Sequence, residues 1–366
     1  MISHPKDQIT TIQSALIVTN VIIATGIITL PRAVAEEVGT PDGWISVMLG
    51  GLIALFFGWV VGKVSQSFPC QSFFQYSQVV AGNFLGKLHG MFFVGFLLLS
   101  AGHQARIMGE VIRMYLLDNT PIEVIIISFM SVGVYLTIGG INPIARICEL
   151  FFLVIAILLL LLVIFSFRNF ELDNLRPVLG DGIQPVWKGI KVTALSYGGY
   201  EVMLVLAFFM KEPQKAVKSI MAGIGIVIPL YTLVVILAIG TLTLDEVKTL
   251  TWPMMSVAKA IELPGGFFER FEAFFVVLWV MAMYTSFVPF HYAACLGLGQ
   301  LFKKDHNAFA FGLLPLIYII ALYPENLNSI FKLGEYIGYV YIFLGAVMPL
   351  YFWMIAKIRG KGIGEN

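Results

Sequence analysis

The most constraining feature of the sequence is an apolar stretch over residues 9–38, which is long enough to cross a bilayer and is interrupted near its middle. The interruption is the run ATGI at residues 24–27, and Pro31 follows it by about one helical turn. Lipid offers no hydrogen-bond partners, so a spanning segment must pair its backbone groups within its own helix. The run therefore predicts a discontinuous helix whose free backbone groups face a cavity, as at the substrate sites of secondary transporters. The alternative is that Gly26 only allows close packing against a neighbouring helix.

The composition places the chain among polytopic membrane proteins. Of its 366 residues, 58% are hydrophobic and 12% are charged, whereas soluble domains carry about 25% charged residues. A net charge of +1 argues against a nucleic-acid-binding face, and three scattered cysteines are too few for a disulfide framework or a zinc site. Nucleotide-binding, metalloprotease and nucleophile-elbow motifs are missing from the sequence. We therefore expect no enzyme activity, no catalytic residues, no metal and no cofactor.

Ten segments approach the length of about 20 mostly apolar residues that a spanning helix needs. They cover residues 11–34, 44–64, 88–116, 121–138, 143–167, 189–209, 219–242, 268–298, 308–322 and 330–358. The longest separator, residues 168–188, contains two prolines and two glycines and is expected to lie along the membrane surface. It divides a single transmembrane domain, residues 1–366, into halves at 1–167 and 189–366. Five crossings per half place the halves in opposite orientations, which is typical of an inverted repeat.

The sixth segment is interrupted where the first one is. Its run YGGYE, from Tyr197 to Glu201, places paired glycines and a carboxylate inside an otherwise apolar helix. Each glycine lowers helix propensity by about 1 kcal/mol, and a charge in mid-span is costly. The sequence therefore predicts an all-α fold of ten transmembrane helices, arranged five plus five, with helices 1 and 6 broken.

The two predicted breaks together suit a zwitterionic ligand such as an amino acid. A half-helix that begins near Ile27 would direct its N–H groups at a ligand carboxylate. Glu201 could accept the ligand ammonium group or exchange a proton, or it could only offset the dipole of its own half-helix. The sequence leaves these two roles of Glu201 open.

Charged residues of the third segment share one helical face. His103, Arg106, Glu110 and Arg113 follow one another at spacings of 3, 4 and 3 residues. Such charges normally face the protein interior or water. Arg106 and Glu110 are expected to form an internal ion pair, and the alternative is that His103, Arg106 and Glu110 form a gate or polar pathway to the site.

The eighth segment carries three adjacent hydroxyl groups at mid-depth, on Tyr284, Thr285 and Ser286. They could form hydrogen bonds between helices. They could also hold a small cation, with Thr285 and Ser286 joined by the backbone carbonyl of Ala24 at the first break.

The distribution of lysine and arginine predicts the orientation of the chain. Loops on the side of the N-terminus are richer in these residues, and the C-terminal tail adds Lys357, Arg359 and Lys361. By the positive-inside rule, both termini are expected to be cytoplasmic.

The motifs ATGIITLPRAVAEEVGTPDGW, RPVLGDGI and YGGYE resemble the B-subunits of spore germinant receptors, which belong to the amino acid–polyamine–organocation superfamily. The similarity extends from Gln8 to the tenth segment. It implies a LeuT-like fold with a ligand between helices 1, 3, 6 and 8. It also implies a place in the spore inner membrane, with the termini on the core side, and a complex with an A-subunit and a lipoprotein C-subunit. The ligand contacts that the resemblance implies are Thr25, Gly26, Ile27, Leu98, Gly102, Gly198, Gly199, Tyr284 and Ser286.

Three functions are compatible with these features. The first is a nutrient-sensing receptor subunit that binds a small polar germinant, an amino acid above all, at the bilayer midplane and triggers germination. The second is an amino-acid transporter coupled to protons or sodium. The third is a conduit for water or ions that opens in germination. The fold alone does not separate them, because function depends on the site.

Overall fold

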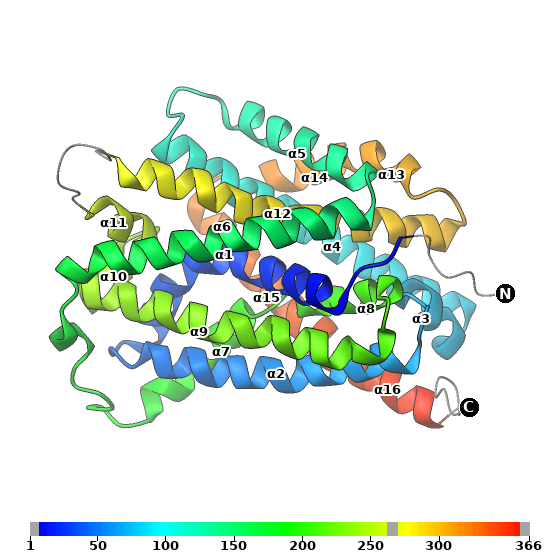
Figure 1. Ribbon diagram of the computed structural model, residues 1–366, viewed down its shortest axis with the longest axis horizontal. Helices are drawn as coiled ribbons and strands as arrows, with labels where there is room; N and C mark the ends of the chain where they lie inside the picture. The colour runs from blue at the N-terminus through cyan, green and yellow to red at the C-terminus, as the bar shows by residue number, and fades with distance from the viewer. Residues whose placement is uncertain (1–6, 262–269, 359–366) are drawn as a thin grey trace.

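The structure is a computed structural model that describes residues 7–261 and 270–358. Within these residues the secondary structure is helical, apart from an isolated bridge between Ile9 and Met210. The first two residues of the predicted eighth segment, and Arg359 and Lys361 of the tail, lie outside the described residues. The long helices run side by side along the longest axis of the molecule (Figure 1).

Eight helical segments are long and apolar enough to cross a membrane, and two shorter apolar ones bring the number in the described ranges to the predicted ten. The long segments are α1 (Thr11–Val38), α2 (Gly43–Ser67), α4 (Asn83–Tyr115), α6 with η1 (Ile141–Asn169), α7 to η4 (Gln184–Phe209), η5 with α9 (Pro213–Leu242), α12 (Phe271–Phe302) and α15 to α16 (Leu327–Ile358). The shorter ones are α5 (Ile122–Ile138) and α13 with α14 (Asn307–Leu322). Short helices outside these spans are α3 (Phe73–Ala81), η2 (Leu172–Leu175), α10 (Leu244–Thr249) and α11 (Pro253–Lys259).

The predicted break in the first helix is wrong. α1 runs without interruption through Thr25, Gly26 and Pro31. It is the most enclosed of the long helices, with 83% of its apolar window buried, and it packs against α6, α7, α9 and α12. Gly26 faces the aromatic ring of Tyr231 on α9, so its small size serves a close approach of a side chain and not a helix end. This is the packing role that the sequence left as the alternative.

The predicted break in the sixth helix is confirmed. α7 (Gln184–Ser196) ends before Tyr197, and the chain continues as η3 (Tyr200–Val202), α8 (Met203–Leu206) and η4 (Ala207–Phe209). Gly199 lies between them with φ 120° and ψ −22°, a backbone conformation that residues other than glycine rarely adopt. Its N–H group donates a 2.9 Å hydrogen bond to Glu201 Oε2, which satisfies one donor at the break.

The spans form two packed groups. In the first group α1, α2 and α9 contact one another and α7 packs against α1 and α2. In the second group α4, α5 and α12 contact one another and α14 packs against α4 and α5. The groups meet where α1 packs against α12, while α15 packs against both α4 and α7. A space for a ligand between the two groups would therefore be bounded by α1, α4, α7 and α15.

The separator between the predicted halves lies at the left end of the molecule in Figure 1, opposite the end of α16. It contains η2, and α7 begins at Gln184, four residues before the predicted end of the separator at residue 188. The backbone N–H of Glu171 donates to the carbonyl of Gly240, and that of Leu179 donates to Asp42 Oδ1. These bonds fix the separator to the ends of α9 and α2. The boundaries of the two halves, 1–167 and 189–366, stay a prediction.

Candidate functional site

A cavity of about 570 Å³ lies between α1, α4, α7 and α15. Along α1 its lining begins at Val21, in the middle of the helix, and continues to Glu37 near the C-terminal end. The cavity therefore reaches from the centre of the molecule toward the end at which α1 finishes. Its volume falls within the range of about 300–1,000 Å³ that is usual for small-molecule sites.

The wall at the inner end of the cavity combines uncharged polar groups with the apolar side chains of Val21 and Ile22. It is formed by the middle of α1, by Ser100 and Gln104 on α4, and by Ser196 and Gly198 at the break after α7. The backbone at this break presents the C-terminal end of α7, where aligned peptide dipoles carry partial negative charge. Hydroxyl, amide and backbone groups can orient a small polar ligand here.

Charged residues gather toward the outer end of the cavity. Arg32 Nε lies 2.8 Å from Glu36 Oε1 on α1, and the Arg32 guanidinium lies 5.4 Å from the centre of the Phe331 ring on α15. Lys191 Nζ on α7 lies 3.8 Å from Glu335 Oε1 on α15. These contacts connect α1 and α7 with α15 across the mouth of the cavity.

Three of the predicted ligand contacts line the cavity: Thr25, Gly26 and Gly198. The Thr25 hydroxyl has one weak contact, at 3.8 Å from Met283 Sδ. The predicted carboxylate site is wrong in its mechanism, because the backbone N–H groups at residues 25–27 belong to the interior of a continuous helix. A ligand beside this turn would therefore meet the Thr25 hydroxyl group, while the ring of Tyr231 occupies the space next to Gly26.

The other predicted contacts lie outside the described lining. Ile27 and Leu98 are buried in the apolar core, and Gly102 packs against Ile320. Gly199 forms the break, and the Tyr284 hydroxyl donates to the carbonyl of Val132 at 3.0 Å. Glu201 is fully buried and accepts a hydrogen bond from the Gly199 N–H group. The Ser286 hydroxyl donates a hydrogen bond to α1. His103 lines the cavity, and its Nε2 lies 3.2 Å from the carbonyl oxygen of Ile330.

The oxygens of the candidate cation site are each engaged in the described structure. The carbonyl of Ala24 accepts a 2.8 Å hydrogen bond from Trp279 Nε1, and the Thr285 hydroxyl lies 3.2 Å from Asn20 Oδ1. The Ser286 hydroxyl donates to the carbonyl of Val21 at 3.0 Å. These contacts join α12 to α1 directly, which is the cross-helix role that the sequence left open beside the cation.

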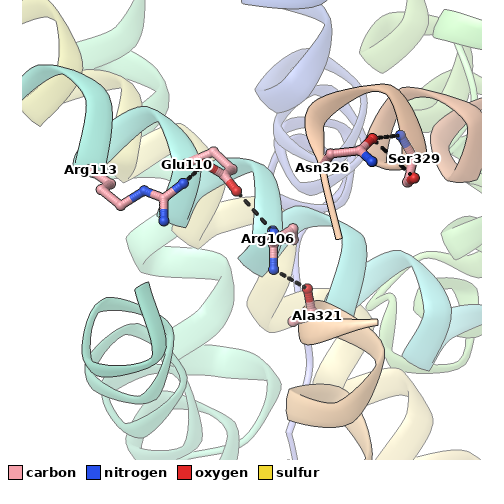
Figure 2. A network of polar contacts seen from close by, with 6 residues as sticks. All are labelled: Arg106, Glu110, Arg113, Ala321, Asn326 and Ser329. Carbon is pink, nitrogen blue, oxygen red and sulfur yellow. Dashed lines mark hydrogen bonds and ion pairs between the residues drawn. The ribbon is translucent and has the colours of Figure 1, made fainter. Parts of the chain in front are cut away.

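The charged face of α4 forms the ion pair that its spacing predicts. Arg106 and Glu110 are both buried, with 3.0 Å between Nη2 and Oε1, and Arg113 adds a 2.7 Å contact to Glu110 Oε2. Figure 2 shows the three side chains along α4, with Arg106 also reaching the carbonyl of Ala321 at the end of α14, at 3.4 Å. Arg106 and Glu110 are not among the described lining residues, and their role as a gate or pathway stays a prediction.

Sequence reasoning missed Gln104. It lies on α4 one turn after Ser100, is 5% exposed, and lines the cavity. Its Nε2 donates a 2.7 Å hydrogen bond to Ser286 Oγ on α12. The available signal is an uncharged amide inside a spanning segment, next to the charged residues of the same helix.

Solved structures with the same arrangement define the fold class. The chain superposes on MhsT in complex with L-phenylalanine with a TM-score of 0.68 at 13% identity, covering 96% of this chain and 99% of that one. It superposes on Mhp1, a nucleobase-cation-symport-1 family transporter in a closed conformation with bromovinylhydantoin bound, with a TM-score of 0.64 at 10% identity, covering 97% and 94% of the two chains. The molecule is an integral membrane protein of the LeuT-like transporter fold, and not an enzyme.

Relatives in sequence narrow the class further. Residues 8–330 match the family described as spore germination protein. Among proteins of Bacillus subtilis strain 168, the chain is 40% identical to spore germination protein YndE over 98% of this chain and 99% of the relative. It is 35% identical to spore germination protein A2 over 96% of each chain, and 32% identical to spore germination protein B2 over 97% of each. The chain belongs to the spore germination protein family, and its role is that of a receptor-like or permease-like membrane protein of spore germination.

Proposed function

We propose that this chain is the germinant-sensing membrane subunit of a spore germination receptor and that a small polar germinant binds in the cavity. The observation that carries the proposal is the set of uncharged polar groups on α1, α4 and the break after α7 that line a cavity of about 570 Å³. The wall belongs to both packed groups of helices. A ligand held there would therefore have different contacts in different arrangements of the groups, which is the requirement for shifting a conformational equilibrium.

An amino acid is the first candidate for the germinant. Its ammonium group suits the C-terminal end of α7, where Ser196 and Gly198 line the cavity. The structural neighbour MhsT is described in complex with L-phenylalanine, which supports an amino acid in a cavity of this fold. The basic side chains of Arg32 and Lys191 offer a carboxylate opposite charge toward the mouth.

The proposal includes an assembly and a location. The chain acts in a complex with an A-subunit and a lipoprotein C-subunit, in the spore inner membrane, with both termini on the core side. Membership of the spore germination protein family supports this arrangement. Copurification of the A- and C-subunits with the tagged chain from spore inner membranes tests the complex, and accessibility of an added cysteine at either terminus tests the orientation.

The second candidate is an amino-acid transporter, which the transporter fold of the structural neighbours favours. Coupling to sodium has less support than coupling to protons, because Thr285 and Ser286 bond directly to α1. Two measurements on the purified chain separate the candidates. Stabilisation in nanodiscs by one of the twenty L-amino acids, without uptake of that radiolabelled amino acid into proteoliposomes, is the result expected for a sensor. Saturable uptake driven by a proton or sodium gradient would establish the transporter instead.

A further inference from the structure

The tenth span presents an aromatic ring to the cavity at Tyr341. Tyr341 lines the cavity and is partly exposed, although it lies on the inward side of the span, where Ile337, Leu344 and Gly345 are buried. The outward side of the same span carries exposed side chains such as that of Tyr336. Because Tyr341 faces inward, the exposed part of its ring belongs to the cavity wall and not to the surface in contact with lipid.

Three other parts of the chain hold this ring in place. Phe96 on α4 packs edge-on against it, with ring centres 4.8 Å apart, and the ring centre of Phe290 on α12 lies 6.5 Å away. Both phenylalanines are buried. Gly198 at the break after α7 lies so close that a Cβ atom there would overlap with the Tyr341 ring. Closely packed side chains have little freedom to move aside, so the ring sets a fixed limit to the space beside it.

Apolar side chains extend the wall around Tyr341. Ile337 lies one turn before it on α15, and the Leu195 side chain packs where this helix meets α7. On α1, two further apolar residues lie beside Gly199, next to the glycine that faces the ring. We call this part of the cavity the apolar corner, and its lining consists of Val21, Ile22, Leu195, Ile337 and Tyr341.

Hydroxyl groups border the apolar corner on the same helices. Thr25 lies one turn after Ile22 on α1, and Ser196 follows Leu195 at the end of α7. A molecule with a polar head and an apolar side chain can therefore place its head at these groups and bury its side chain in the corner. Burial of apolar surface favours such a ligand, whereas a polar side chain would lose its hydrogen bonds to water there.

We infer that Tyr341 is a specificity-determining residue and that the apolar corner takes the aliphatic or aromatic side chain of an amino acid. This inference rests on the proposed function and names the subclass of its ligand. The Tyr341 ring limits the size of the bound side chain, because it closes the corner against the break after α7. A charged or amide side chain would be buried against four aliphatic side chains that offer it no hydrogen bond.

The test uses the full chain in lipid nanodiscs and compares the twenty L-amino acids by calorimetric titration. Pairs of similar shape are the critical probes: alanine with serine, valine with threonine, leucine with asparagine and methionine with glutamine. The wild-type chain is expected to bind an amino acid with an aliphatic or aromatic side chain most tightly. In each pair that binds, it should prefer the apolar member about 10- to 100-fold, the discrimination that an apolar pocket reaches between such molecules.

Substitutions in α15 test the role of the ring. Tyr341→Ala opens the corner beside Gly198, so the ratio of affinities for larger over smaller apolar amino acids should rise about 10-fold relative to the wild type. Tyr341→Phe keeps the ring and should stay closer to the wild-type ratio than Tyr341→Ala does. Ile337→Ala enlarges the same corner and leaves the ring in place, so it should shift the ratio in the same direction even if Tyr341→Ala does not fold.

Tyr336→Ala is the matched control, because this tyrosine lies on the outward side of the same helix and is 67% exposed. Its affinities should equal those of the wild type. An unchanged ratio in the folded Tyr341→Ala and Ile337→Ala variants would overturn this inference alone, as would tightest binding of a charged or amide side chain by the wild type. Binding of none of the twenty amino acids by the wild type would overturn the proposed amino-acid germinant itself.

Discussion

The hydroxyl group of Tyr231 on α9 donates a 2.6 Å hydrogen bond to the backbone carbonyl of Ile22 in the middle of α1. Gly26 lies one turn further along α1, and a Cβ atom there would overlap with the phenol ring of Tyr231. The tyrosine therefore reaches the helix backbone only because residue 26 has no side chain. Ser286 and Trp279 bond to the neighbouring carbonyls of Val21 and Ala24, so side chains from two helices hold one turn of α1.

Substitution at Gly26 should destabilise the chain through Tyr231. Gly26→Ala forces the phenol away from the carbonyl of Ile22, and overpacking of this kind costs about 1–3 kcal/mol. Tyr231→Phe, which only removes the hydrogen bond, should cost about 1 kcal/mol. The free energy of unfolding, measured in mixed micelles titrated with dodecyl sulfate, checks both values.

A double-mutant cycle identifies the contact as the cause. Tyr231→Leu shortens the side chain and clears the space next to residue 26, so the double variant Gly26→Ala/Tyr231→Leu should lose less stability than the sum of the single variants. Strict additivity of the two changes would show that Gly26 acts independently of Tyr231.

The ion pair on α4 should respond unequally to the loss of its partners. Glu110→Ala leaves the buried guanidinium of Arg106 without a carboxylate and should cost about 3–5 kcal/mol. Arg113→Ala removes a half-exposed partner and should cost less than about 1 kcal/mol. The unfolding temperatures of the two variants in nanodiscs test this difference. Similar losses of stability would mean that water hydrates the Arg106 guanidinium when Glu110 is absent.

Glu201 should act on the break after α7 and not on the ligand. Glu201→Gln keeps an oxygen that can accept from Gly199 N, so binding of amino acids and thermal stability should both remain near those of the wild type. Glu201→Leu removes the acceptor from a buried N–H group and should cost about 1–3 kcal/mol. Loss of amino-acid binding in Glu201→Gln, with stability unchanged, would instead establish Glu201 as a ligand group, which is one of the two roles that the sequence left open.

Gly199 should not tolerate any side chain. At φ 120° alanine is strained by about 1–3 kcal/mol, and its Cβ would lie 2.8 Å from Val21 Cγ1. Gly95→Ala is the control, because Gly95 lies within α4 and an added Cβ atom there would meet no other atom within 4 Å. Alanine at this position should raise stability by about 0.5–1 kcal/mol. A comparison of the two unfolding temperatures tests this, and equal effects would mean that the conformation at Gly199 is not required.

The site was only partly predictable from the sequence. Thr25, Gly26 and Gly198 could be found because hydroxyl and glycine residues interrupt apolar segments, and they do line the cavity. Gln104 also lines the cavity, but its contact depends on Ser286, a residue 182 positions away whose hydroxyl oxygen accepts a hydrogen bond from the Gln104 amide, and the sequence does not show this pairing. Glu201 was found as a residue but its partner, Gly199 N, depends on the conformation of the break.

The sequence by itself determined the ten apolar segments that are helical in the described part of the chain, and the break in the sixth of them. Segment length and apolar character decide the first, because lipid leaves unpaired backbone groups no partner. Paired glycines next to Glu201 decide the second, because they are poor helix formers whatever surrounds them. Only the tertiary structure decided that α1 stays continuous at Gly26. A single glycine in a helix can mark either an end or a close contact, and the phenol of Tyr231, 205 positions away in the chain, makes it a contact.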